Sequence, residues 1–318
     1  MPRRDAGTVE AITMTNYNII QKRNIWLLIS AALFVAGAAA LLTWGFKFGV
    51  DFTGGSLLEV RFYKERPTVM EIQDALKDKS VGDLGSLVVQ PAGEKDVSLR
   101  FQATTEDKHL AVVSAMEKLA KNKDKNNKVE ELRFDSVGPS IGQDLKTKSV
   151  TAIFYVLLAI LLYISWTFRK VSKPISSWKY GVAALISLFH DAIITLGVFS
   201  ILGKFYGVEI NTPFVAAILT VIGYSVHDTI VVFDRIRENL PKSNHDFEET
   251  VNISLNQTLV RSINTSLTVL LTLLAVTIFG GASVRTFALA LTIGIFIGTY
   301  SSIFVASPIL VIWEKWKK

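Results

Sequence analysis

The sequence has no cysteine among its 318 residues. Disulfide bonds and thiol chemistry are therefore excluded, and any exported part of the chain must be held together by its core alone. The zinc-binding His-Glu-x-x-His pattern and the phosphate-binding Walker pattern are also missing, which argues against a metalloprotease and against an ATPase in this chain. We expect neither a cofactor nor a metal site.

What the chain does have is long apolar runs separated by charged stretches. Half of its residues are hydrophobic, and about 20 apolar residues are enough to cross a bilayer as a helix. The sequence therefore predicts a polytopic α-helical membrane protein with six transmembrane helices. Gly294 and Gly298, four residues apart in the last run, permit close helix contact. The six runs are Asn24–Gly45, Val150–Phe168, Trp178–Leu202, Pro213–Phe233, Ser262–Phe279 and Phe287–Trp313.

The basic residues indicate how the chain is oriented. A net charge of +6 can attract nucleic acid, but the lysines and arginines cluster beside alternate ends of the apolar runs, so no nucleic acid is expected. The positive-inside rule places both termini in the cytoplasm. Residues 1–23 are then a cytoplasmic tail. The run at 24–45 is too long for a signal-peptide core and lacks a cleavage pattern after it, so we expect it to remain as the first transmembrane anchor.

Residues 46–149, between the first two runs, predict one extracytoplasmic α+β domain. Alternating and helical apolar patterns occur here in the order βαββαβ, which is typical of a ferredoxin-like unit. The predicted strands are 55–63, 86–90, 96–102 and 128–134, and the predicted helices are 67–77 and about 104–121. Residues 150–318 then hold the other five spans.

The stretch 234–261, between the fourth and fifth runs, has apolar residues at helical spacing. Phe247, Val251 and Leu255 fall on one face, which predicts a cytoplasmic amphipathic helix on the membrane surface. Packing of this face against a partner is the alternative, and the sequence leaves both open.

An aspartate interrupts the fourth run. A carboxylate inside hydrocarbon is costly, so Asp228 is by default a functional residue. At a rise of about 1.5 Å per residue, it lies roughly 20 Å from the outer end of the span and belongs to the inner third of the bilayer. Tyr224 and Ser225 lie one turn earlier on the same face, where their hydroxyls can bond either protonation state. The side chain of His227 points about 100° around the helix axis from that of Asp228.

Arg261 opens the fifth run at a depth close to that of Asp228, so the two residues can pair. A nearby cation favours the charged carboxylate while burial disfavours it, and this competition makes a carboxyl switchable by conformation. The sequence leaves open the alternative that Arg261 only extends its side chain from a helix end to the membrane surface.

The third run repeats the His-Asp pattern at His190 and Asp191. Asp191 falls near the midplane, where it can relay protons or accept hydrogen bonds from Ser or Thr on a neighbouring helix. Either histidine, His190 or His227, can assist proton movement or remain a neutral imidazole hydrogen-bonded to one neighbour. Asp191 and Asp228 can also form a dyad like that of aspartic proteases, although the Gly-x-Gly-Asp pattern expected of an intramembrane protease is absent.

Several motifs, taken together, resemble one family. They occur in order along the chain, and the resemblance covers essentially everything after the first twenty or so residues. By these motifs the chain resembles the SecF subunits of the SecD/SecF family, within the resistance-nodulation-division superfamily. The matching stretches are 49–55 (GVDFTGG), 137–142 (VGPSIG), 221–239 (VIGYSVHDTIVVFDRIREN), 256–266 (NQTLVRSINTS) and 280–309.

The resemblance implies a protein-transport subunit and not an enzyme. Such a subunit pairs with SecD, works with the SecYEG translocon and accessory membrane proteins such as YajC and YidC, and promotes the export of preproteins across the bacterial or archaeal cytoplasmic (inner) membrane. The proton motive force drives it, with H⁺ as the coupling ion, or Na⁺ in some lineages. The family's functional carboxyl falls on Asp228 and its functional arginine on Arg261. The residues that can relay protons or support this pair are Asp191, His190, His227, Tyr224 and Ser225.

Two other functions remain as alternatives. A solute exporter of the same superfamily also needs an intramembrane carboxyl, but usually has larger paired external domains that enclose a substrate path. An intramembrane aspartyl protease needs Asp191 and Asp228 close together, so the distance between these two carboxyls tests the protease interpretation.

Overall fold

The computed structural model describes residues 17–78, 81–169 and 176–316. It divides into two compact units. The helical unit contains the described residues up to Gly45, then Tyr155–Tyr206, and those from Ala216 onward. The α+β unit contains Phe46–Phe154 and Gly207–Val215. Most of the predicted cytoplasmic tail, residues 1–16, lies outside the described residues.

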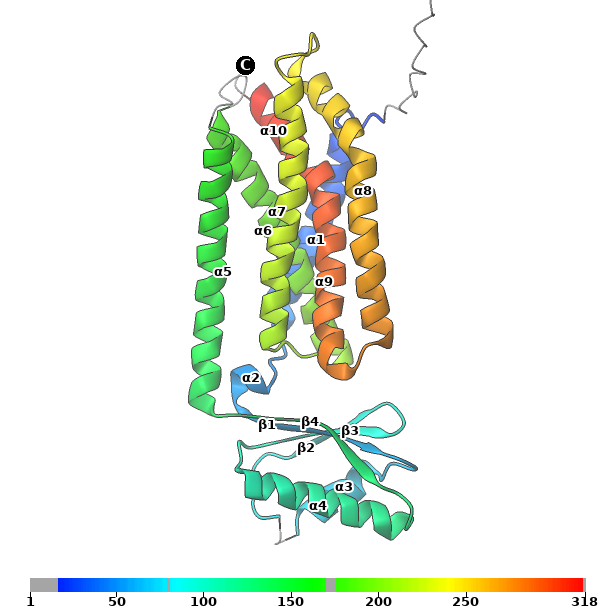
Figure 1. Cartoon of the computed structure of the whole chain (residues 1–318). Helices are drawn as coiled ribbons and strands as arrows, with labels where there is room; N and C mark the ends of the chain where they lie inside the picture. The colour runs from blue at the N-terminus through cyan, green and yellow to red at the C-terminus, as the bar shows by residue number, and fades with distance from the viewer. Residues whose placement is uncertain (1–16, 79–80, 170–175, 317–318) are drawn as a thin grey trace, which may run out of the picture. The chain divides into compact units, whose positions relative to one another are not determined.

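The described part of the chain contains six helices long and apolar enough to cross a membrane, which confirms the predicted class. The last span is one continuous run of α9, the π-helical turn η1 and α10 (Figure 1). The helices are α1 (Arg23–Trp44), α5 (Pro139–Thr167), α6 (Ser177–Tyr206), α7 (Thr212–Asn239), α8 (Phe247–Phe279), α9 (Ala282–Ser301), η1 (Ser302–Ala306) and α10 (Ser307–Lys315).

Small residues let the helices of this unit approach closely. Gly197 of α6 packs on the backbone of Gly37 of α1, and a Cβ at Gly197 would overlap that backbone. The predicted contact at Gly294 and Gly298 is also present: α9 lies there against α7, and a Cβ on Gly298 would be 2.9 Å from the Cβ of Ser225. Without a hydrophobic force between helices in lipid, such close packing is a main source of stability.

The stretch 234–261 does not form the predicted separate surface helix. Its first part completes α7, a turn follows, and the rest is the beginning of α8. Phe247, Val251 and Leu255 are buried within the helical unit, so their helical spacing reflects packing against the protein's own bundle.

The α+β unit has the predicted βαββαβ order. Its four antiparallel strands lie in the order β2-β3-β1-β4, which is the ferredoxin-like arrangement, and α3 and α4 cover one face (Figure 1). The elements are α2 (Val50–Thr53), β1 (Gly55–Phe62), α3 (Val69–Leu76), β2 (Val88–Ala92), β3 (Asp96–Phe101), α4 (Glu106–Lys123) and β4 (Val129–Val137).

The core of this unit follows from alternation in the strands and helical spacing in the helices. Leu58 and Leu99 from the sheet pack with Ile72 and Met116 from the helices, and all four are fully buried. Since the chain has no cysteine, this apolar core takes the place of the disulfides that stabilise many small domains.

Glycine substitutions test the close crossing of α1 and α6. We expect Gly197→Ala to destabilise the protein by about 1–3 kcal/mol, because the added methyl group forces the two backbones apart. Thermal unfolding in detergent measures this. Gly223→Ala is the matched control, since a Cβ there meets none of the described atoms within 4 Å and alanine favours the helix. Equal stability of the two variants would contradict the crossing.

Candidate functional site

Asp228 lies inside the helical unit, where three helical segments meet. Its side chain is 7% exposed. Its Oδ1 accepts a hydrogen bond from the hydroxyl of Ser262 on α8 at 2.7 Å, and its Oδ2 accepts one from Ser302 of η1 at 2.6 Å. Each oxygen of the buried carboxyl therefore has one hydroxyl partner.

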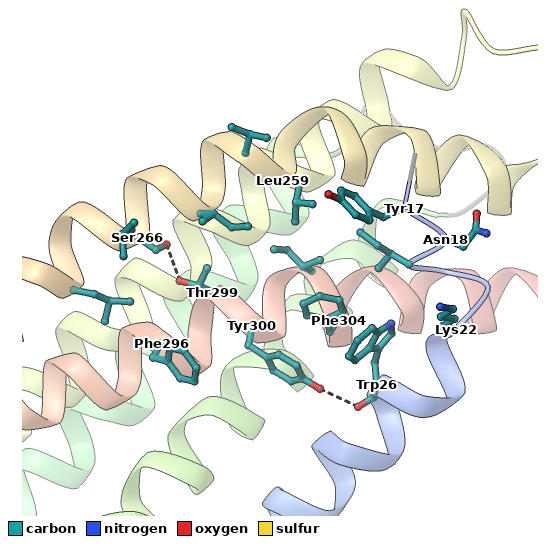
Figure 2. A pocket seen from close by; sticks show the side chains of 16 residues that line it. Tyr17, Asn18, Lys22, Trp26, Leu259, Ser266, Phe296, Thr299, Tyr300 and Phe304 are labelled. Atoms are coloured by element: carbon teal, nitrogen blue, oxygen red, sulfur yellow. Dashed lines mark hydrogen bonds between the residues drawn. The ribbon is translucent and has the colours of Figure 1, made fainter. Parts of the chain in front are cut away.

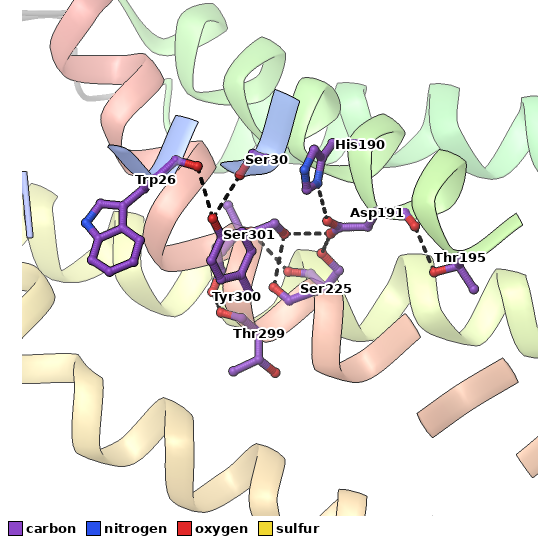
Figure 3. Close-up of polar contacts among 12 residues, drawn as sticks. Trp26, Ser30, His190, Asp191, Thr195, Ser225, Thr299, Tyr300 and Ser301 are labelled. Atoms are coloured by element: carbon purple, nitrogen blue, oxygen red, sulfur yellow. Dashed lines mark hydrogen bonds and ion pairs between the residues drawn. The ribbon is translucent and has the colours of Figure 1, made fainter. Parts of the chain in front are cut away.

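Asp191 on α6 is the centre of a second network (Figure 3). Its Oδ2 accepts hydrogen bonds from Ser225 of α7 at 2.6 Å and from Ser301 of α9 at 2.7 Å. Its Oδ1 lies 3.0 Å from Nδ1 of His190. These are the contacts expected if Asp191 joins neighbouring helices through hydroxyls, and its role as a proton relay stays a prediction.

Consecutive serines of the last span serve both carboxyls. Ser301 ends α9 and bonds Asp191, while Ser302 begins the π-helical turn and bonds Asp228. Helices α7 and α9 are close enough for this because Gly298 faces Ser225. Short π-helical turns are frequent at functional sites, and this one lies where the two networks meet.

Arg261 does not contact Asp228 in this structure. It is exposed and lines a pocket of about 510 Å³ between the ends of α7 and α8, together with Asp234 and Glu238. In the described ranges no ion pair joins Arg261 to Asp228. One residue is about 100° of helix rotation, so the next side chain, Ser262, faces the carboxyl while Arg261 faces the pocket.

The other predicted residues divide between the two networks. Ser225 donates to Asp191 and not to Asp228, and Tyr224 donates to Ser266 at 3.2 Å, so the two hydroxyls expected beside Asp228 bond elsewhere. His227, about 100° around α7 from the carboxyl, is exposed. The ring of His190 stacks on Phe34 with centroids 6.4 Å apart.

Sequence reasoning missed the serines that hold Asp228. Ser262 adjoins Arg261, and the pair Ser301-Ser302 interrupts the last apolar run, so polar residues inside apolar spans were the available signal. Their partners could not be assigned because the relative rotation of the helices is not encoded locally.

The start of α7 belongs to the α+β unit. The N–H of Thr212, the first residue of α7, donates to the carboxylate of Asp51 at 2.8 Å, which satisfies a helix-terminal donor and matches the helix dipole. Gly49 N–H donates to the carbonyl of Ile210 at 2.7 Å. A Cβ on Gly49 would be 3.1 Å from that carbonyl oxygen, so glycine suits this close approach.

Charged groups reinforce these contacts within the unit. Glu209, just before α7, forms an ion pair with Arg100 of β3, and its other oxygen lies 3.4 Å from Nζ of Lys47. Burial, and then the positive charge of Arg100, lower the pKa of Lys47. We name the contacts among residues 46–53, 207–212 and Arg100 the α7 clamp.

These features define a class: a multi-pass α-helical membrane protein with one α+β unit inserted after its first span and two hydroxyl-bonded carboxyls inside its bundle. Residues 116–316 match the family model described as protein export membrane protein SecD/SecF, C-terminal, and residues 39–62 match the SecD/SecF GG motif. The chain therefore belongs to the SecD/SecF family of protein export membrane proteins.

Relatives and solved structures agree with this family. The chain is 44% identical over 308 residues to the protein translocase subunit SecF of Thermobaculum terrenum, covering 93% of this chain and 94% of the relative. It is 39% identical to SecF of Haemophilus influenzae, covering 90% and 83%. The crystal structure of SecDF, a translocon-associated membrane protein from Thermus thermophilus, superposes with a TM-score of 0.76 at 32% identity; 94% of this chain matches 39% of that longer chain.

Removal of one hydroxyl tests how Asp228 is held. We expect Ser302→Ala to destabilise the helical unit by about 1–3 kcal/mol, because Oδ2 of Asp228 is left without its donor. The measurement is thermal unfolding of the purified protein. Ser187→Ala is the control, since that hydroxyl is buried and has no partner in the described part of the chain. If both variants lose the same stability, the hydrogen bond to Asp228 does not hold the unit together.

Proposed function

We propose that this chain is the SecF subunit of a SecD–SecF complex that uses the proton motive force to promote protein export through the SecYEG translocon. Asp228 carries the coupling proton, and Arg261 is its partner when it is ionised. The observation that supports this most directly is the buried Asp228 carboxyl held by two hydroxyls, with a cation one residue from one of those hydroxyls.

The hydroxyl partners suit a group that changes its protonation state. A hydroxyl can donate to a carboxylate and can also accept from a protonated carboxyl. Ser262 and Ser302 can therefore hold Asp228 with or without its proton. This arrangement stores a proton in a buried site without requiring a fixed counter-ion.

Ionised Asp228 needs a cation, and Arg261 supplies it in the second state. Rotation of α8 by about one residue position exchanges Ser262 for Arg261 in front of Asp228. The pocket of about 510 Å³ around Arg261 gives the guanidinium room to leave and return. Alternation between the hydroxyl-bonded and arginine-paired states couples a proton to helix movement.

Energy for this alternation comes from the membrane potential and the proton gradient. One charge moved across 100 mV supplies about 2.3 kcal/mol. That free energy biases two conformational states by roughly 50-fold, which is enough to give repeated cycles a direction.

Helix α7 carries the movement to the α+β unit. It runs without interruption from Thr212 in the α7 clamp to Asn239, and Asp228 lies about 24 Å along it at 1.5 Å per residue. A shift of α7 at Asp228 is thus applied directly to residues bound by the clamp. In this proposal the α+β unit is extracytoplasmic and acts on the exported preprotein.

Partners and location follow from the same assignment. SecD, the SecYEG translocon, YajC, YidC and preproteins are the proposed partners, in the bacterial or archaeal inner membrane with both termini cytoplasmic. This chain matches 39% of the longer SecDF chain, and the rest of that chain is long enough to contain a SecD half. H⁺ is the proposed coupling ion; Na⁺ is the alternative, because carboxylate and hydroxyl oxygens also bind hard cations.

The two alternatives have less support. Asp191 and Asp228 accept hydrogen bonds from separate groups, whereas a protease dyad shares one proton between adjacent carboxyls. A solute exporter would need a substrate path through larger external domains, and the single α+β unit has a filled core.

Replacement of the carboxyl tests the coupling. Asp228→Asn is expected to insert and fold normally but to abolish gradient-dependent export, because an amide does not titrate; Asp228→Glu is expected to retain part. Export is measured in vesicles containing this chain, SecD and SecYEG, with H⁺ and Na⁺ gradients collapsed separately. Asp144→Asn, an exposed carboxyl on α5, is the control and keeps the wild-type rate. Wild-type export by Asp228→Asn would rule out this carboxyl as the coupling group.

Arginine variants test the second state. Arg261→Lys is expected to keep more export than Arg261→Met, because lysine preserves the charge although it lacks the planar fork. The same vesicle assay measures this, and Arg285→Met, an exposed arginine at the start of α9, serves as the control. Equal loss in both Arg261 variants would indicate a geometric role, while no loss in either would show that Arg261 only extends to the membrane surface.

A further inference from the structure

A groove lies on the helical unit between the beginning of α1, the helix α8 and the last span (Figure 2). Its volume is about 700 Å³, within the range of roughly 300–1,000 Å³ typical of small-molecule sites. Most of its wall is apolar, with Ile263 and Leu267 from α8 and Phe296 and Phe304 from the last span. The proposed export function does not use this groove.

Two hydroxyls of the wall already have partners. Thr299 donates to Ser266 at 2.7 Å, and the Tyr300 hydroxyl donates to the carbonyl of Trp26 at 3.0 Å (Figure 2). These two hydroxyls therefore need no ligand, and the apolar side chains around them suit a hydrocarbon chain.

One end of the groove is polar and carries hydrogen-bond donors. Lys22 is exposed there, and it has no carboxylate partner among the described residues. The indole Nε1 of Trp26 is buried and, in the same described residues, lacks an acceptor. The adjacent Arg23 is already paired with Glu248, so it does not neutralise an additional ligand. An ammonium and an orphaned N–H thus lie together at this end (Figure 2).

The position of these two donors at the start of the first span indicates which lipid atoms lie at their level. Helix α1 begins at Arg23, so Trp26 lies in the first turn of the span, where tryptophan and lysine meet lipid headgroups. The phosphate and ester oxygens of a phospholipid lie at this level, and its acyl chains extend toward the bilayer centre, as the apolar wall does.

We propose that the groove binds an anionic phospholipid. Its phosphate accepts from Lys22, a phosphate or ester oxygen accepts from the indole N–H of Trp26, and one acyl chain lies against α8 and α9. A helix of a partner protein would cover the apolar wall, but its backbone carbonyls are engaged within the helix and leave the indole N–H unsatisfied. The unpaired charge of Lys22 selects an anionic headgroup over a zwitterionic one.

The chain before α1 fixes this end of the groove in advance. The backbone N–H of Tyr17 donates to Asn256 at 2.7 Å, and those of Ile19 and Ile20 donate to Asn252 at 3.0 and 3.2 Å. A site whose wall is already ordered loses less entropy when it binds.

Quenching of Trp26 fluorescence tests the proposal. The full chain is reconstituted, alone and with SecD, into vesicles of phosphatidylglycerol and phosphatidylcholine in which one lipid at a time carries brominated acyl chains that quench tryptophan on contact. The chain has six tryptophans, so the Trp26 signal is the difference between the wild type and Trp26→Phe. We expect brominated phosphatidylglycerol to quench it about fivefold more effectively, as for one ion pair at the membrane surface.

Matched variants separate a site from ordinary boundary lipid. Lys22→Gln is expected to abolish the preference, while Lys242→Gln, at the same end of the bundle but outside the groove, keeps it. Ile263→Phe, which fills the groove, should reduce quenching by both lipids, and Ile278→Phe, further along α8, should not.

Three outcomes would overturn the proposal. The first is equal quenching of wild-type Trp26 by the two lipids, and the second is a preference that survives Lys22→Gln. The third is loss of all quenching when SecD is added, which would mean that protein and not lipid occupies the groove. None of these readouts depends on export activity.

Discussion

Two carboxyl groups buried among apolar helices must be satisfied by hydrogen bonds, and much of the helical unit serves that requirement. Asp191 and Asp228 receive hydroxyls from α7, α8 and the last span. Gly294 and Gly298 let α9 approach α7 closely, just before Ser301 and Ser302 of the last span. The π-helical turn then presents successive serines to different carboxyls. In this bundle, the hydrogen bonding of the buried carboxyls and the close packing of the helices therefore depend on each other.

The sequence predicted the elements well because apolar length and alternation are local properties. Asp228 could be identified because a carboxylate is out of place in an apolar run. Its partner Ser302 could not, because most hydroxyls in membrane helices bond the backbone of their own helix, as several do here. Depth along the axis brought Arg261 near the carboxyl, but the rotation that selects Ser262 depends on distant contacts. The stretch 234–261 was misassigned because one apolar stripe suits both a membrane surface and a protein core.

The α7 clamp builds a distant stretch of the chain into the α+β unit. Residues 207–215, which precede and begin α7, belong to this unit. Backbone bonds and the Glu209–Arg100 ion pair hold the loop before α7 there. The GG motif makes a second close contact within the unit, since Gly54 has φ 73° and packs on Pro139 at the start of α5. Sequence motifs from both ends of the inserted segment are therefore in contact.

The contacts of Tyr17 with Asn256 join residues 239 positions apart. Because a chain is made from its amino end, the segment before α1 emerges long before the helix that completes it. Until then, water and headgroups at the membrane boundary can bond its backbone. The groove beside Trp26 is therefore completed only after both the fifth span and the last span have been inserted.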